Sequence, residues 1–243
     1  MSVQDRYKAF VSDQREFFDA LIVEDWDTYF SLDWDEARRF EVHSLFERVQ
    51  PQTVLDIGCG CGFHDREMAQ FPFVKKVVGI DYSAKSVEMA DLYYAHPKVE
   101  RRVADLRDLQ GETFDLVVSW QVIEHLEKPE EYFQSVGKLL NPGGSLAIFT
   151  PHRLRLSNRL RQMKGLPVEW CDPQHFTEYE PHELIELGKK HGFEPVSSYG
   201  YGMAGPRFID RLPMRRKIWL GQRFPAFASL ICVIMRRADR PLI

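Results

Sequence analysis

The sequence has few cysteines, no long apolar run and no excess of basic residues. Its 243 residues include four cysteines without a Cys-x-x-Cys pair, which argues against a disulfide framework and a zinc site. This cysteine usage predicts a reducing, cytoplasmic setting. The first residues are polar and lead into a charged stretch, so we expect no secretory signal. The longest apolar run, near Leu230 to Met235, is far too short to span a bilayer.

The charge balance also limits the function. A net charge of −4 and a pI near 6.1 argue against a general nucleic-acid binder, although a local basic patch remains compatible with them. There is no internal repeat and no low-complexity tract. With 44% hydrophobic and 28% charged residues, the chain is typical of a globular protein with a full core, and its length fits one α/β domain with additions.

A glycine-rich stretch is the most informative part of the sequence. Residues 54–57 form the end of a predicted buried strand, Gly58, Gly60 and Gly62 follow at alternate positions, and a helical pattern starts near Phe63. Missing side chains let the backbone approach a ligand, and a helix N-terminus offers unpaired N–H groups. This stretch therefore predicts a nucleotide-type site.

Strands and helices alternate along the chain, which predicts a parallel, doubly wound sheet. We expect strands at 76–81, 99–104, 114–120, 145–149, 194–201 and 229–235, and helices at 63–69, 84–94, 129–140 and 181–191. The last two strands are joined by a Pro/Gly/Arg-rich segment, 202–227, that we predict to be a loop. They suggest an antiparallel hairpin at one edge of the sheet.

The first fifty residues have helical periodicity and many aromatic side chains. Predicted helices lie around 17–26 and at 34–48. Two interpretations remain open: a lid over the ligand, for which Tyr29 is the best candidate, or a helical layer that packs on the sheet.

Acidic residues follow successive predicted strands at the edge where ligands bind in open α/β sheets. Asp56 precedes the glycine loop, and we expect its carboxylate to point at the ligand. Asp81 is placed to accept hydrogen bonds from ribose hydroxyls, and Asp105 with Leu106 suits an exocyclic amine and an apolar ring face. The fourth strand adds Ser119, Trp120 and Gln121.

Two cofactors compete for such a site. A dinucleotide site requires G-x-G-x-x-G, but here the third glycine comes one position early. Asp56 would repel a pyrophosphate, whereas it suits the cationic amine and sulfonium of S-adenosylmethionine.

These motifs resemble those of class I S-adenosylmethionine-dependent methyltransferases, and within them the small-molecule group that includes the ubiquinone-biosynthesis O-methyltransferases. The resemblance covers residues 50–151 tightly and extends loosely to 193; Cys61 departs from the usual Thr or Ser. It rests on 54–62, 78–81, 104–106, 114–118, 122–126 and 139–144. It implies S-adenosylmethionine bound by Asp56, Gly58, Cys59, Gly60, Gly62, Asp81, Tyr82, Asp105, Leu106, Trp120 and Gln121.

The resemblance also implies a Rossmann-like fold with a seven-stranded, mostly parallel sheet whose last strand is reversed. We expect a single domain over 1–243. It would comprise an N-terminal helical lid (1–50), a cofactor-binding core (51–151), a cap insert (152–180) and a C-terminal helix and strands (181–243). The implied activity is methyl transfer to a small molecule, at oxygen in preference to nitrogen or carbon.

Histidines supply the candidate acceptor site. We predict His125 and His175 as catalytic residues, each able to take a proton from the acceptor, with Glu124 as a partner; a structural role is the alternative for each. His152 falls in the same region, so we expect a pocket bounded by these histidines. A cation held by His152, Asp172 and His175 is conceivable, but the set is not a clean oxygen site, and we predict no metal.

Arginines gather after the fifth predicted strand, and they allow three interpretations. They form a solvated surface, a clamp for an anionic acceptor, or a membrane-surface element. The rivals to a small-molecule enzyme are a tRNA or other nucleic-acid methyltransferase, disfavoured by the acidic pI, and a non-catalytic cofactor-binding protein. The sequence leaves the oligomeric state open. The arginines are Arg155, Arg159, Arg207, Arg211, Arg215 and Arg216.

Overall fold

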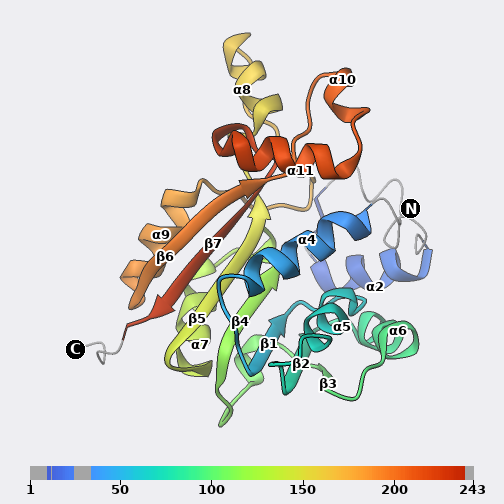
Figure 1. The fold of residues 1–243 in the computed structure, drawn as a ribbon. Helices are drawn as coiled ribbons and strands as arrows, with labels where there is room; N and C mark the ends of the chain where they lie inside the picture. Colours follow the sequence, from blue (N-terminus) through green and yellow to red (C-terminus); the bar gives the residue numbers. More distant parts are fainter. Residues whose placement is uncertain (1–9, 12, 25–33, 239–243) are drawn as a thin grey trace.

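The structure, a computed structural model, describes residues 10–11, 13–24 and 34–238. Seven strands form one sheet in the order β3-β2-β1-β4-β5-β7-β6 (Figure 1). All are parallel except β7, which runs antiparallel to both β5 and β6, so the predicted reversed last strand is confirmed. The strands are β1 Thr53–Ile57, β2 Lys76–Asp81, β3 Val99–Val103, β4 Phe114–Trp120, β5 Leu140–Pro151, β6 Phe193–Tyr201 and β7 Leu230–Arg237.

Helices cover both faces of the sheet, as a doubly wound fold requires. On one face α7 and α9 pack through Phe133 and Leu184, and on the other α4, α5 and α11 pack through Phe46, Met68 and Ile218. The helices are α2 Gln14–Glu24, α4 Asp35–Phe46, α5 Phe63–Ala69, α6 Ala84–Tyr94, α7 Pro129–Leu139, α8 Leu156–Met163, α9 Pro181–Lys190, α10 Arg207–Asp210 and α11 Met214–Arg223, with short 3₁₀ turns η2 Leu106–Asp108, η3 Ile123–His125 and η4 Pro225–Phe227.

Alternation of side chains along the strands produces two core layers. Leu55 and Ile57 belong to the layer under α7 and α9, whereas Val54 belongs to the layer under α4 and α11. Because both faces are covered, β1 is buried from Val54 onward and is hydrophobic at every position except Asp56. The apolar strand in the sequence thus becomes an inner strand of the sheet, between β2 and β4.

The predicted loop over 202–227 is wrong, because this segment contains α10, α11 and η4. Proline precedes both helices, at Pro206 and Pro213, and Ile218 buries the inner face of α11 against the sheet. A Cβ on Gly221 would lie 2.3 Å from the Gly202 carbonyl oxygen, so the glycine permits this close packing. Tertiary contact therefore outweighed the Pro/Gly-rich composition from which we predicted a loop.

The N-terminal region contains α2 and α4. Ser83 donates a hydrogen bond from Oγ to Asp19 Oδ1 at 2.5 Å, which joins α2 to the start of α6. The lid candidate Tyr29 lies outside the described residues. In the part of the chain that the structure describes, no helix combines the length and the apolar character needed to cross a membrane.

Candidate active site

A cavity of about 930 Å³ lies beyond the carboxyl ends of the central strands. This is at the large end of the range for small-molecule sites, so it offers space for a cofactor and an acceptor together. The N-terminal helix contributes to it through Gln14 and Phe18. Of the eleven predicted cofactor residues, ten line the cavity: Gly58, Cys59, Gly60, Gly62, Asp81, Tyr82, Asp105, Leu106, Trp120 and Gln121.

The glycine loop forms the floor of the cavity. Gly60 has a φ of +50°, and a Cβ built on it would meet no atom within 4 Å, so the loop leaves open space there. Gly62 starts α5 with a φ of +79°, and a Cβ there would lie 2.7 Å from Arg101 Nη2. Gly60 therefore leaves room for a ligand, whereas a glycine is required at position 62 by the packing behind the loop.

Asp81 connects the end of β2 to the glycine loop. Its Oδ2 accepts the Gly60 N–H at 2.9 Å, and its Oδ1 accepts the Ser83 N–H at 2.8 Å. Burial raises the pKa of Asp81 to about 6, although both backbone N–H groups act against the shift. The carboxylate keeps lone pairs free at the cavity wall, as two ribose hydroxyls would need.

The next two strand ends complete the wall. Asp105 accepts two hydrogen bonds from the Arg107 guanidinium, both at 2.8 Å, and these bonds hold the pKa of Asp105 below its usual value. Trp120 stacks on His64 with ring centroids 4.3 Å apart. Gln121 has a φ of +56°, the one positive φ among the described non-glycine residues. Backbone in this sparsely populated region is concentrated at functional sites.

The structure corrects the role predicted for Asp56. Its carboxylate is fully buried, does not line the cavity and makes no hydrogen bond of normal geometry to any described residue. Burial and the neighbouring Asp65 carboxylate raise the pKa of Asp56 well above its ordinary value. Asp65 pairs with Arg101 at 2.8 Å, so the proton of this acidic pair belongs on Asp56. Asp56 is buried because its side chain points from the pleated strand into the protein. Its position at the end of the strand did not reveal this direction.

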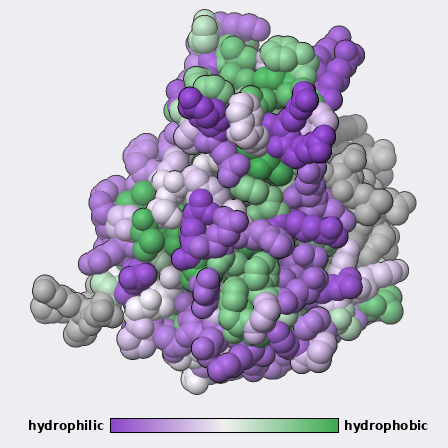
Figure 2. Space-filling model, viewed as in Figure 1, coloured by the Kyte–Doolittle hydropathy of each residue, from purple (hydrophilic) through white to green (hydrophobic). Residues whose placement is uncertain are grey.

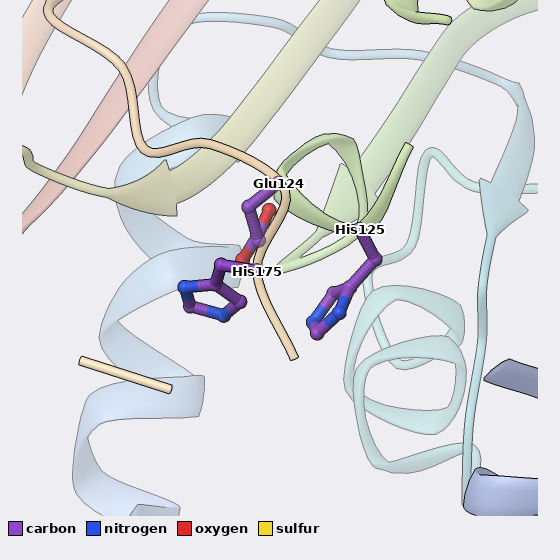
Figure 3. A group of neighbouring side chains, drawn as sticks. All are labelled: Glu124, His125 and His175. Carbon is purple, nitrogen blue, oxygen red and sulfur yellow. The ribbon is translucent and has the colours of Figure 1, made fainter. Parts of the chain in front are cut away.

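Glu124, His125 and His175 meet at one side of the cavity (Figure 3). The two histidine rings pack edge to face with centroids 4.8 Å apart, although fifty residues separate them. Burial, followed by the charge of His175, lowers the pKa of His125 to about 3, so its imidazole is neutral. Burial also raises the pKa of Glu124 to about 7, and its Oε1 has no hydrogen-bond partner among the described residues.

Each of these histidines is oriented through one ring nitrogen. His125 Nδ1 lies 3.2 Å from the Gln174 carbonyl oxygen, and His175 Nδ1 lies 3.2 Å from Glu178 Oε1. Glu178 is fully buried and also accepts hydrogen bonds from the Cys171 N–H and the Arg155 guanidinium. Burial opposes ionisation of Glu178, but these bonds hold its pKa below the usual value. Glu178 is not among the site residues predicted from the sequence; its position three residues after His175 was the available signal.

Other predicted acceptor-site residues lie elsewhere. His152 is buried away from the cavity, with Nδ1 3.0 Å from the Ala228 carbonyl oxygen and Nε2 3.2 Å from Glu180 Oε2. The expectation that His152 bounds the pocket together with His125 and His175 is therefore wrong. The arginine clamp is also wrong for this cavity: Arg155 is buried on Glu178, and none of the six candidate arginines lines the wall.

Two sets of side chains bring possible metal-ligand atoms within 4.8 Å of one another. One is Glu124, His125 and His175, and the other is Cys171, His175 and Glu178. Neither is the set considered from the sequence. Because both sets share His175, its chemistry as a base and its capacity as a ligand must be separated by experiment.

Comparison with known proteins agrees with this geometry. A family model described as a methyltransferase domain matches residues 34–198. A probable S-adenosylmethionine-dependent methyltransferase of Mycolicibacterium smegmatis is 32% identical over 167 residues, which are 67% of this chain and 61% of that protein. A ubiquinone biosynthesis O-methyltransferase of Bordetella avium is 28% identical over 196 residues, 72% of this chain and 80% of that protein.

A solved structure shares the fold. The magnesium protoporphyrin IX methyltransferase of Synechocystis, bound to S-adenosylhomocysteine, has a TM-score of 0.64 and 16% identity, covering 92% of this chain and 98% of that chain. The fold and the cavity define a Rossmann-like methyltransferase. The chain belongs to the methyltransferase domain family, and its cofactor is S-adenosylmethionine. Its match spans less than two thirds of the length of the M. smegmatis relative.

Proposed function

We propose that this protein transfers the methyl group of S-adenosylmethionine to an oxygen of a small molecule, with His175 as the general base. The observation that supports this most is the oriented imidazole of His175 at the cavity wall, with its Nδ1 hydrogen-bonded to Glu178. A hydroxyl acceptor is protonated near neutral pH, so its transfer reaction benefits from a positioned base. The O-methyltransferase name of the B. avium relative is in accord with oxygen.

Different residues bind the cofactor and the acceptor, at two ends of the cavity. Gly60 and Asp81 hold the cofactor, Trp120 and Phe18 limit access of water, and the histidines face the acceptor. S-adenosylmethionine supplies an already activated methyl group on its sulfonium. The main task of the chain is therefore to align the acceptor oxygen and remove its proton.

His175 suits proton removal better than its neighbours do. Its Nδ1–H donates to the ionised Glu178, which leaves the Nε2 lone pair for the acceptor and stabilises the imidazolium that forms. His125 has a pKa of about 3 and is too weak a base near neutrality, so we assign it to packing and orientation of the acceptor. Glu124, with a pKa of about 7, would donate a hydrogen bond from its protonated form.

The experiment measures release of S-adenosylhomocysteine from the purified chain with panels of phenols, sugars, carboxylic acids, amines and tRNA. We expect turnover with a hydroxyl compound, and His175→Ala should lower kcat by about 10²-fold or more with unchanged cofactor affinity. Methylation of tRNA alone would establish the nucleic-acid rival. Tight cofactor binding without acceptor-dependent release across all panels would favour a non-catalytic sensor.

A chelator distinguishes a base from a metal ligand. If His175 acts as the base, activity withstands EDTA. Loss of activity in EDTA and its recovery with Zn²⁺ or Mn²⁺ would instead assign Glu124, His125 and His175 as ligands of a cation. His125→Ala serves as the comparison, because removing a metal ligand should then be as severe as His175→Ala.

A further inference from the structure

Exposed apolar side chains gather on one projecting part of the molecule, formed by α8 with the residues just after it, α10, α11 and η4. We call this part the cap surface. Figure 1 shows α8 and α10 projecting beyond the end of the sheet, and Figure 2 shows hydrophobic patches there beside strongly hydrophilic residues. Of the thirteen large hydrophobic residues that are exposed in the described chain, six lie on the cap surface: Met163, Leu166, Phe208, Trp219, Phe224 and Phe227.

The exposure of these side chains is large. Met163 is 83% exposed, Phe208 70% and Trp219 60%. Single exposed hydrophobic residues are normal on protein surfaces, but a concentration of aromatic side chains marks an interaction site. The cap surface therefore fits a partner that takes apolar groups.

The cap surface is also strongly basic. Residues 207–227 contain six basic residues and one acidic residue, Asp210, although the whole chain carries a net charge of −4. In the described part of the chain the basic side chains of α10 and α11 form no ion pairs, so their charge is available to a partner. The five arginines are Arg207, Arg211, Arg215, Arg216 and Arg223.

Helix α11 separates an inner face from an outer face. Ile218 and Gly221 are buried against the sheet, whereas Trp219 points outward one turn after Arg215 and Arg216. A tryptophan between arginines suits the boundary of a lipid bilayer, where the indole enters the headgroup region and the guanidinium groups meet phosphates. The outer face of α11 is thus complementary to an anionic bilayer in both polarity and charge.

The cap surface adjoins the catalytic cavity. Pro151 and Leu230 line the cavity, α8 begins five residues after Pro151, and η4 ends three residues before Leu230. Arg159 fixes α8 to η4 by donating from Nε to the Ala226 carbonyl oxygen at 2.8 Å. Docking through the cap surface would bring the acceptor end of the cavity close to the membrane.

We propose that the cap surface is a docking site for an anionic lipid bilayer, through insertion of Phe208 and Trp219 and contacts of the arginines with phosphate headgroups. Binding of RNA would also use arginines and aromatic rings. The aliphatic and thioether side chains of Leu166 and Met163, on a projecting rather than a grooved surface, favour lipid. This proposal does not depend on which acceptor the enzyme methylates.

The experiment uses co-sedimentation of the full chain with phosphatidylcholine vesicles that contain about a quarter phosphatidylglycerol. We expect binding that weakens with salt and is lost on pure phosphatidylcholine. Arg215→Ala with Arg216→Ala should lower the partition coefficient about 30-fold, and Phe208→Ser with Trp219→Ser about tenfold. The matched control is Leu92→Ser on α6, which removes a side chain that is 69% exposed but lies outside the cap surface.

Calorimetric affinity for S-adenosylhomocysteine shows that each variant is folded. The proposal is overturned if the wild-type chain fails to bind phosphatidylglycerol vesicles at low salt, or if the cap variants bind as well as wild type. Preference for an RNA oligonucleotide over vesicles, with the same sensitivity to the cap variants, would make the surface a nucleic-acid site. A dimer in sedimentation that Trp219→Ser dissociates would make it an interface between copies.

Discussion

Glu178 holds His175 by its Nδ1 atom at 3.2 Å, while its other carboxylate oxygen accepts from the buried Arg155 guanidinium. The histidine ring is therefore oriented by a charge that is itself fixed inside the protein. A carboxylate in this position selects the tautomer of a histidine and stabilises its protonated form. This relationship makes Glu178 a positioning residue for the proposed base.

Replacement of Glu178 tests this relationship. Glu178→Gln should lower kcat about tenfold to a hundredfold, because the imidazolium loses its stabilising charge. It should also move the acid limb of the kcat/KM profile to lower pH, because the protonated ring loses the carboxylate that stabilises it; a purely structural role would not move this limb. The matched control is Glu180→Gln, which breaks the Glu180–His152 pair away from the cavity and should leave the limb in place. An unmoved limb in Glu178→Gln would exclude the positioning role.

Asp81 is the residue that we propose as the partner of the cofactor ribose. Removing the carboxylate in Asp81→Ala should weaken binding of S-adenosylhomocysteine by about 2 kcal/mol, because a charged hydrogen-bond acceptor for the ribose is lost. Isothermal titration calorimetry measures the change. Unchanged affinity would mean that another group holds the ribose.

The same residue predicts a pH dependence. The pKa of Asp81 in the free protein is about 6, and the ionised form is the better acceptor. The dissociation constant should therefore fall about tenfold between pH 5 and pH 7 and stay level above pH 7. In Asp81→Asn this slope should disappear; a slope that persists in the variant would have to come from a different group.

The buried Asp56 predicts an effect on stability. Its pKa is raised by folding, so the folded state binds more protons than the unfolded state, and stability falls as pH rises above the ordinary pKa near 4. This contribution amounts to at most about 1.4 kcal/mol per pH unit. Asp56→Asn should gain stability relative to wild type between pH 5 and pH 8 in urea unfolding. A difference that is constant over this range would show that Asp56 is not protonated in the folded state.

Two glycines of one loop should respond differently to alanine. Gly62→Ala places a Cβ 2.7 Å from Arg101 Nη2 and strains a φ of +79°, so we expect a loss of at least about 2 kcal/mol of folding free energy. Gly60→Ala meets no atom within 4 Å and should cost only about 1 kcal/mol. Its methyl group faces the ligand space, so cofactor affinity should fall more than stability. Equal effects of both variants on unfolding would contradict this distinction.

Much of the fold followed from local pattern. The alternation of apolar strands with amphipathic helices predicted the parallel sheet, and the two C-terminal strands predicted the antiparallel pair at one edge of the sheet. The segment 202–227 was mispredicted because its helices are stabilised by contacts of Ile218 and Gly221 with the sheet rather than by their own composition. The amphipathic pattern of α11 was the available local signal, but the prolines and glycines around it led to the loop prediction.

The sequence by itself determined which strand ends and which glycine loop line the cavity. Strand, glycine loop and helix are contiguous, and Asp81 and Asp105 fall at strand ends that any parallel sheet brings to one edge. Only the tertiary structure decided the acceptor end. It buried His152 on Glu180 and brought His175 and Glu178 to His125 across fifty residues. Among the predicted cofactor residues, it also turned Asp56 inward. The physical reason is that backbone pattern fixes where strands end, whereas loop packing fixes which side chains meet beyond them.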